Sequence, residues 1–252
     1  MRKAKVTVPA ASTNLGPGIE SLGLALNLYV TATFIERNDT RLVIDSSGED
    51  IATLSPDCLH PVMYAAVRVF QRLENGPLGL RIHVENSIPL GVGLGGRAAM
   101  TVAGLIGANN LMDMPLGRDQ LVALGTELLG HADGLVTAML GGLTVSAAGG
   151  ESVLYRRLEL GKRPQVVVAV PRLPEYGPDR IVRPLIVDLP DAVHNLGRVA
   201  LVVDALRTGD FDLLAQALDD RLLRAQFSKR IPGFDAAVYA AREAGAAAVT
   251  VC

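Results

Sequence analysis

The chain has 252 residues, 49% of them apolar and 4% aromatic, with a formal charge of −2. This length suits one large domain or two ordinary ones, and it buries enough surface to fold without a disulfide or a structural metal. The balance of 24 basic and 26 acidic residues gives no reason to expect nucleic acid or a membrane surface as a partner. Two cysteines cannot build a disulfide framework, and no apolar run approaches the ~20 residues that span a bilayer. We therefore expect a cytoplasmic protein.

Strands and helices are expected to mix unevenly along the first 148 residues. Alternation of polar and apolar residues predicts strands, and apolar residues at helical spacing predict helices. The expected strands are 3–9, 22–36, 41–46, 78–86 and 143–147. The expected helices are 57–74, 97–112, 118–129 and a further apolar helix after residue 134. Residues 12–20 hold too many turn formers for regular structure. The strict alternation of 78–86 favours a mixed or antiparallel sheet, so the fold class is α+β.

The second half of the chain is expected to be smaller and mostly helical. Strands are expected at 153–157, 165–170 and 246–252, and helices at 192–207, 210–223 and 234–245. The glycines near residue 150 mark the best domain boundary, which gives domains 1–148 and 149–252. The last strand stops without a turn or a polar tail, so we expect the second domain to be truncated.

The most informative segment is Ile88-Pro-Leu-Gly-Val-Gly-Leu-Gly-Gly-Arg-Ala-Ala-Met100. A strand, a glycine-rich loop and a helix in this order can bind phosphate, because glycines expose backbone N–H groups and the helix start is electropositive. A dinucleotide fingerprint is disfavoured, because helix follows helix and no second parallel strand with a terminal acid appears. A P-loop is disfavoured too, because Arg97 and Ala98 replace its lysine and hydroxyl residue.

A third interpretation covers more of the chain. The loop starting at Pro89 resembles the ATP loop of the GHMP kinases, and Pro9-Ala-Ala-Ser-Thr-Asn-Leu-Gly-Pro-Gly-Ile-Glu-Ser-Leu-Gly resembles the homoserine kinase pattern PASSANLGPGFDSLG. Gly130-His-Ala-Asp-Gly resembles EGHPDN, and Asp191-Ala-Val-His-Asn resembles DAVxN. The closing segments around 220 and 231–235 also match. The resemblance covers essentially the whole chain in order.

This resemblance implies a two-domain GHMP kinase fold, with a ribosomal protein S5-like N-terminal domain and a smaller α+β C-terminal domain. It implies ATP-dependent phosphorylation of the hydroxyl of L-homoserine, a step of threonine biosynthesis. Asp133 and Arg180 would be catalytic, and Asn14, Glu20 and Arg180 would bind the acceptor. The ATP-binding residues would be Pro89, Leu90, Gly91, Val92, Gly93, Leu94, Gly95, Gly96, Arg97, Ala98 and Ala99. A homodimer is one assembly compatible with it.

Several departures from the family pattern fall on the chemistry. The family's two loop serines are Gly96 and Arg97 here, and its acidic Mg²⁺ ligand is Leu129, which offers no oxygen. An arginine that meets the substrate carboxylate in the family is Phe227 here. We therefore expect ATP as the phosphoryl donor with the family's Mg²⁺ ligands lost and no protein metal site. The alternative is a catalytically degenerate homologue that binds a nucleotide, an amino acid or a protein partner without turnover.

Simple structural roles compete with these functional ones. Asn14 can close an Asx turn, Glu20 can be a solvated loop acid, and Asp133 can cap the helix that follows it. Arg97 can clamp a phosphate or fill the emptied phosphate site with its own side chain.

Overall fold

The structure, a computed structural model, describes residues 1–149, 152–171 and 186–251. Its strands are β1 (Lys3–Thr13), β2 (Leu22–Arg37), β3 (Leu42–Gly48), β4 (Gly79–Asn86), β5 (Leu143–Gly149) and β6 (Ser152–Leu158). Its helices are α1 (Pro61–Leu73), α2 (Gly96–Leu111), α3 (Arg118–Leu129), α4 (Asp133–Leu140), α5 (Leu189–Thr208), α6 (Phe211–Ala217), α7 (Arg224–Arg230) and α8 (Phe234–Glu243), with a short 3₁₀ turn η1 (Ile51–Thr53). The α+β class is confirmed.

One mixed sheet organises the first half of the molecule. The long strand β2 pairs antiparallel with β1, with β4 and, at its beginning, with β5. The edge strand β3 runs parallel to β4, and β6 continues the sheet beyond β5 as an antiparallel strand. The alternation in 78–86 predicts a mixed or antiparallel sheet, and the sheet is mixed. In β4 the alternation is complete: Leu80, Ile82 and Val84 are buried, and the residues between them are exposed.

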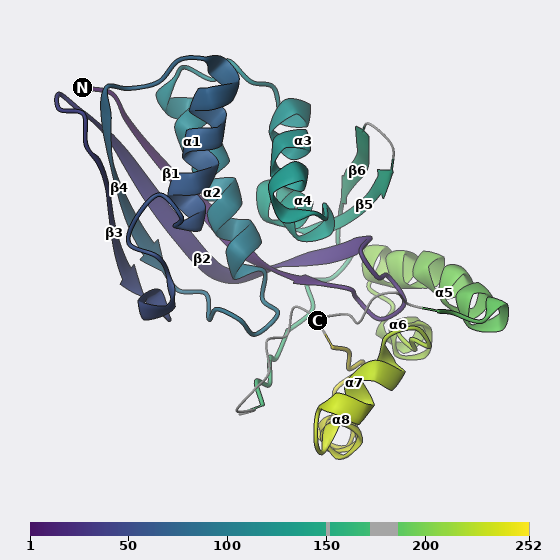
Figure 1. Cartoon of the computed structure of the whole chain (residues 1–252). Coiled ribbons are helices and arrows are strands. Elements are labelled where there is room, and N and C mark those ends of the chain that lie inside the picture. The colour runs from purple at the N-terminus through teal and green to yellow at the C-terminus, as the bar shows by residue number, and fades with distance from the viewer. Residues whose placement is uncertain (150–151, 172–185, 252) are drawn as a thin grey trace.

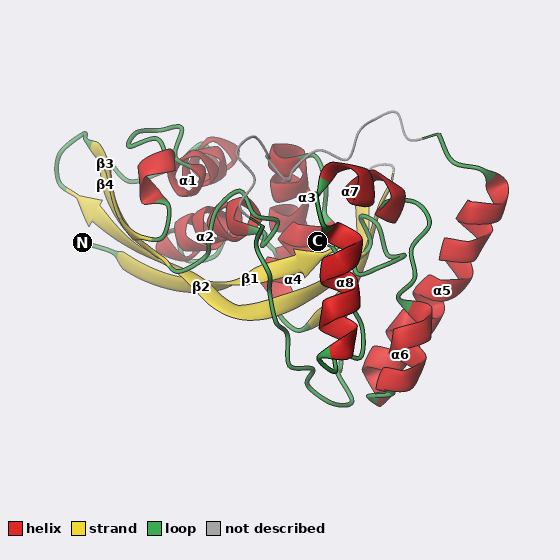
Figure 2. Ribbon diagram, turned by 90° about the horizontal axis from the view of Figure 1, so that it is seen from below, coloured by secondary structure: helices red, strands yellow, loops and turns green. Residues whose placement is uncertain are grey.

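Helices α1 to α4 cover one face of this sheet (Figures 1 and 2). Helix α2 lies directly against β1 and β2, and α1 packs on α2. Glycine and alanine on α2 allow this close approach: a Cβ atom on Gly107 would lie 1.9 Å from Cε2 of the buried Phe34 of β2. The nearly complete burial of α2 fixes the position of its N-terminus, which follows the glycine-rich loop.

A second, smaller core lies where the C-terminal helices meet the sheet. Leu22, Leu24 and Leu143 from the strands pack with apolar residues of α5 and α6. Figure 1 shows α5 to α8 grouped beside the end of the sheet that carries β5 and β6. The division into domains 1–148 and 149–252 stays a prediction, and β5 and β6 pair with each other across it. No helix in the described parts of the chain is long and apolar enough to cross a membrane.

Four expected elements differ from the structure. The expected strand 3–9 continues to Thr13, because its partner β2 already begins at Leu22 and pairs with it that far. Residues 12 and 13, which were expected to be irregular, therefore belong to a strand. The described residues 163–171 and 246–251 form no strand, because no described segment pairs with either.

The expected helix 210–223 ends at Ala217, and α7 begins separately at Arg224. The carboxylate of Asp220 accepts the backbone N–H groups of Leu222, Leu223 and Arg224, so it breaks the first helix and starts the next.

Candidate active site

The glycine-rich loop joins the end of β4 to the beginning of α2. Gly91, Gly93 and Gly95 have φ values of 71°, 82° and 67°, which side-chain-bearing residues rarely adopt. A Cβ atom on Gly95 would also lie 3.0 Å from the carbonyl oxygen of Ala11, whereas a Cβ atom on Gly91 would meet nothing within 4 Å. Glycine is therefore required for packing at 95, and the loop is open at 91.

The far end of this loop is tied to β1. The N–H of Ala11 donates to the carbonyl of Leu94 at 3.1 Å, and Leu94 is buried. Helix α2 then begins at Gly96 with the unpaired N–H groups and positive dipole end of a 16-residue helix. Arg97 is exposed in the first turn. These features suit a chain of phosphate groups.

Asp133 is a buried carboxylate at the start of α4, with 3% exposure. Nδ1 of His131 donates to its Oδ1 at 2.8 Å. Burial alone would raise the pKa of Asp133. The hydrogen bond and charge of His131, the N–H of Gly134 and the hydroxyl of Thr13 outweigh burial, so the pKa lies below its usual value. Asp133 is thus held ionised away from water.

The structure brings Asp133 next to the start of α2. A Cβ atom on Gly134 would lie 3.4 Å from Cβ of Ala98 and 3.8 Å from Cγ2 of Thr13. The end of β1 and the first turns of α2 and α4 therefore meet at one point. Asp133 is the first residue of α4, so it is not the residue before the helix that a capping role requires.

Asn14 and Glu20 lie in the loop between β1 and β2. Oδ1 of Asn14 accepts the N–H of Glu20 at 2.7 Å, and both residues have positive φ. An Asx turn would bond Asn14 to the N–H of Gly16, two residues on, but that N–H donates to Thr250, so the expectation of an Asx turn is wrong. Acceptor binding by Asn14 and Glu20 stays a prediction.

The C-terminal helices and tail hold the same loop. The N–H of Gly16 donates to Oγ1 of Thr250 at 3.1 Å, and Nδ2 of Asn195 donates to the carbonyl of Pro17 at 3.4 Å. A Cβ atom on Gly16 would lie 2.5 Å from the backbone carbonyl oxygen of Leu218 and 2.9 Å from its Cγ, so Leu218 leaves no room for a side chain there.

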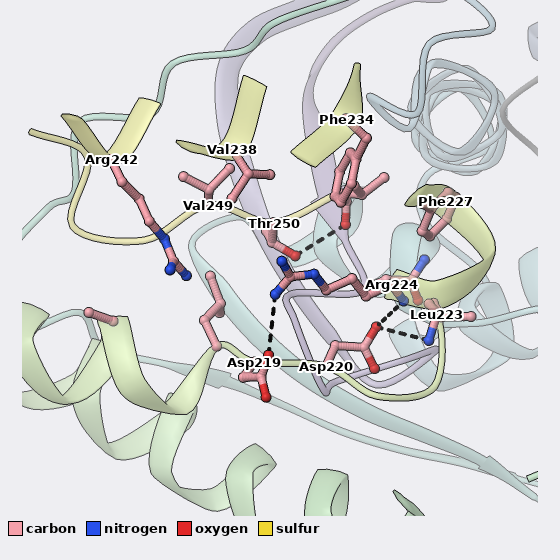
Figure 3. Close-up of a pocket in the computed structure, with 14 residues that line it drawn as sticks. Asp219, Asp220, Leu223, Arg224, Phe227, Phe234, Val238, Arg242, Val249 and Thr250 are labelled. Atoms are coloured by element: carbon pink, nitrogen blue, oxygen red, sulfur yellow. Dashed lines mark hydrogen bonds and ion pairs between the residues drawn. The ribbon is translucent and has the colours of Figure 1, made fainter. Parts of the chain in front are cut away.

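A small pocket lies beside this loop (Figure 3). Asn14 and Thr250 line it together with Arg224 and Phe227 of α7 and Arg242 of α8. Arg224 contacts the carboxylates of Asp219 at 3.4 Å and Asp235 at 3.6 Å. The sequence position at which the family pattern has an arginine, Phe227, therefore lies on the same pocket as Asn14.

Comparison with known proteins decides the family. The family model described as "GHMP kinases N terminal domain" matches residues 61–143. A homoserine kinase of Moorella thermoacetica is 42% identical over 248 residues, which cover 98% of this chain and 83% of that protein. The chain belongs to the homoserine kinases of the GHMP superfamily. A homoserine kinase of Carboxydothermus hydrogenoformans is 35% identical over 98% of this chain and 81% of its own length.

Solved structures agree with this assignment. The crystal structure of homoserine kinase from Cytophaga hutchinsonii superposes with a TM-score of 0.83 at 26% identity, covering 98% of this chain and 81% of that chain. The GHMP kinase fold expected from the sequence is confirmed.

At one departure from the homoserine kinase pattern, position 129, neither the residue itself nor the nearby acid Glu127 of α3 is free to bind a metal. Leu129 packs against the main core, and the carboxylate of Glu127 is bound to Arg68 at 2.9 Å. No group of three or more candidate metal ligands occurs among the described residues. Arg180 lies outside the described residues, so its catalytic and binding roles stay predictions.

Sequence reasoning missed Thr13 and His131, the two side chains that surround Asp133. The spacing His131-x-Asp133 was a usable signal, since residues two apart at a helix start can bond to each other. Nothing in the sequence pairs Thr13 with a residue 120 positions later.

Proposed function

We propose that this protein transfers the γ-phosphoryl group of ATP to the side-chain hydroxyl of L-homoserine, as a cytoplasmic enzyme of threonine biosynthesis. The observation that carries the proposal is the 42% identity to a homoserine kinase over 98% of the chain. The glycine-rich loop beside a buried carboxylate supports it independently.

The loop and α2 would hold the phosphates. Phosphoryl transfer depends mainly on positioning and on neutralising charge, so backbone N–H groups at a helix start contribute directly. Gly91 leaves open space at the loop surface, and Gly96 begins the helix. Arg97, exposed in the first turn, would add one positive charge at the same end.

Asp133 would accept a hydrogen bond from the acceptor hydroxyl and receive its proton. The carboxylate is ionised because of His131 and Thr13, and its burial excludes competing water. In a loose transition state the hydroxyl loses its proton late, so orientation by Asp133 matters more than basicity. As the new O–P bond forms and the bond from the γ-phosphorus to ADP breaks, the hydroxyl proton passes to Asp133.

The remaining roles follow the resemblance. Asn14, Glu20 and Arg180 would bind the amino-acid end of the acceptor. Mg²⁺ bound to ATP would neutralise phosphate charge, held chiefly by the phosphates, since position 129 carries no oxygen.

The test is an assay for ADP release coupled through pyruvate kinase and phosphoenolpyruvate to lactate dehydrogenase, with L-homoserine as acceptor. L-2-Aminobutyrate, which lacks the hydroxyl, is the matched control. We expect ADP release with L-homoserine but not with L-2-aminobutyrate. The ³¹P NMR spectrum of the L-homoserine reaction should show a phosphate monoester of the amino acid. ATP hydrolysis that is equal with both compounds would contradict the proposal. ATP binding without product would favour a homologue that binds without turnover.

A further inference from the structure

We propose that Asp50 and Asn86 are positioning residues that hold the phosphate-binding loop in the shape that ATP requires. This inference rests on the proposed function, because it assigns the loop to ATP. Neither residue belongs to the loop motif. Both lie where β3 and β4 leave the sheet side by side.

Asn86 joins three segments at the end of β4. It is 3% exposed. Its Nδ2 donates to the carbonyls of Glu49 and Ile88, both at 2.8 Å, and its Oδ1 accepts the N–H of Ile88 at 3.0 Å. Its backbone carbonyl also accepts the N–H of Glu49 at 2.9 Å. The side chain therefore fixes the first residues of the loop to the end of β3.

Asp50 makes the second tie, one residue further along the turn after β3. Its Oδ2 accepts the N–H of Leu90, inside the loop, at 2.9 Å. The backbone of Asp50 has a φ of 51°, and its carbonyl accepts the N–H of Thr53 at 3.0 Å and the hydroxyl of Thr53 at 2.7 Å. The carboxylate is thus anchored on a turn with its own hydrogen bonds.

The position of Leu90 connects this tie to the start of α2. A Cβ atom on Gly96 would lie 2.5 Å from Cδ2 of Leu90, so the Leu90 side chain covers the first residue of the helix. Beyond Leu90, the loop is next fixed at Leu94, which Ala11 holds. Only Gly91, Val92 and Gly93 lie between these two ties, so Asp50 decides where this short span begins.

Removing the Asp50 side chain has two effects on ATP binding, one through its charge and one through its hydrogen bond to Leu90. A carboxylate close to a triphosphate repels it, so loss of the charge alone would strengthen ATP binding. Loss of the tie would weaken ATP binding, because the loop then has to be ordered by the nucleotide. The two effects have opposite signs, and the tie is the one we expect to dominate.

The experiment compares Asp50→Ala with Asp50→Asn and the wild type. Alanine removes the acceptor for Leu90, whereas asparagine keeps an acceptor oxygen and removes the charge. We expect the KM for ATP to rise about three- to tenfold in Asp50→Ala, with the KM for L-homoserine unchanged, as the loss of one ordinary solvent-exposed hydrogen bond implies. Asp50→Asn should restore the KM for ATP to within about twofold of wild type.

Asp57→Ala is the matched control. Asp57 lies in the same connection and accepts the N–H of Leu59 at 2.8 Å, but the contacts of its side chain are to Ser55 and Leu59, not to the loop. It should leave both KM values unchanged, even where the melting temperature falls. Asn86→Ala should raise the KM for ATP as Asp50→Ala does.

The outcomes separate this proposal from the proposed function. An unchanged or lower KM for ATP in Asp50→Ala, or an equal rise in Asp57→Ala, overturns the positioning role. If wild-type protein binds ATP but does not phosphorylate L-homoserine, the proposed function fails, and calorimetric ATP affinities of the same variants decide the positioning role. Wild-type protein that binds no ATP overturns both.

Discussion

The contact between Gly107 of α2 and Phe34 of β2 allows a quantitative test of how α2 is positioned. A Cβ atom on Gly107 would lie 1.9 Å from Cε2 and 2.4 Å from Cζ of Phe34. Ordinary contacts between carbon atoms are about 3.5–4.0 Å, so the ring would have to move by about 1.5–2 Å. Phe34 is fully buried, so the ring has no free space to enter.

Gly107→Ala therefore combines two opposing effects. Overpacking a core costs about 1–3 kcal/mol, and replacing a helical glycine by alanine returns about 1 kcal/mol. A separation as short as 1.9 Å belongs at the upper end of the overpacking range. We expect a net loss of about 2 kcal/mol in the free energy of unfolding, or a fall of about 4–8 °C in melting temperature for a chain of this length.

Gly197 of α5 provides the matched control. It also lies inside a long helix, but a Cβ atom there would meet nothing within 4 Å. Gly197→Ala should raise the free energy of unfolding by about 0.5–1 kcal/mol. Urea denaturation of both variants measures the difference between them.

A double variant identifies the cause. Phe34→Leu removes ring atoms, so Gly107→Ala should cost about 1 kcal/mol less in that background than in wild type. If Gly107→Ala is as stable as wild type, or if the two substitutions act additively, Phe34 does not limit the approach of α2 and the packing argument is refuted.

Three further predictions concern charge. Asp133→Asn should lower kcat about 10²–10⁴-fold with ATP affinity retained. His131→Ala should move the acid limb of the pH–rate profile to higher pH, because without His131 the burial of Asp133 raises the pKa of its carboxyl group. An unmoved acid limb contradicts the role of His131 in keeping Asp133 ionised. Burial lowers the pKa of His60 to about 4. Stability should therefore fall by up to about 1.4 kcal/mol per unit as pH drops from about 6.5 to 4, and His60→Asn should lose that part of the slope in urea titrations at several pH values. Calorimetry should find that ATP binding to the wild type depends only weakly on Mg²⁺ and that ATP binding to Leu129→Glu depends on Mg²⁺ more strongly. Strict dependence on Mg²⁺ in the wild type would contradict the loss of the protein's Mg²⁺ ligands.

The periodic elements of this fold could be predicted from the sequence. The alternation in β4 and the helical spacing in α1 and α3 reflect burial on one face, which local patterns record directly. The sequence predicts where helix α6 begins but not where it ends. Gly209 and Asp210 mark the end of one helix and the start of the next by their residue types alone. The break between α6 and α7 instead depends on the three backbone N–H groups that the Asp220 carboxylate accepts.

Contacts between distant segments could not be predicted in this way. The 165–170 run has the composition of a strand, but a strand also needs a partner, and composition does not name one. For the site, the glycine-rich loop was found because its chemistry is local. The bond from Leu90 to Asp50 and the contact of Asp133 with Thr13 join residues 40 and 120 positions apart, and only the fold brings them together.

The bond between Gly16 and Thr250 joins residues 234 positions apart. During synthesis the β1–β2 loop therefore reaches this hydrogen bonding only after Thr250 has left the ribosome. The sheet and α2 can assemble long before that moment. A nascent chain would then have its glycine-rich loop in place before the β1–β2 loop has all of its hydrogen bonds.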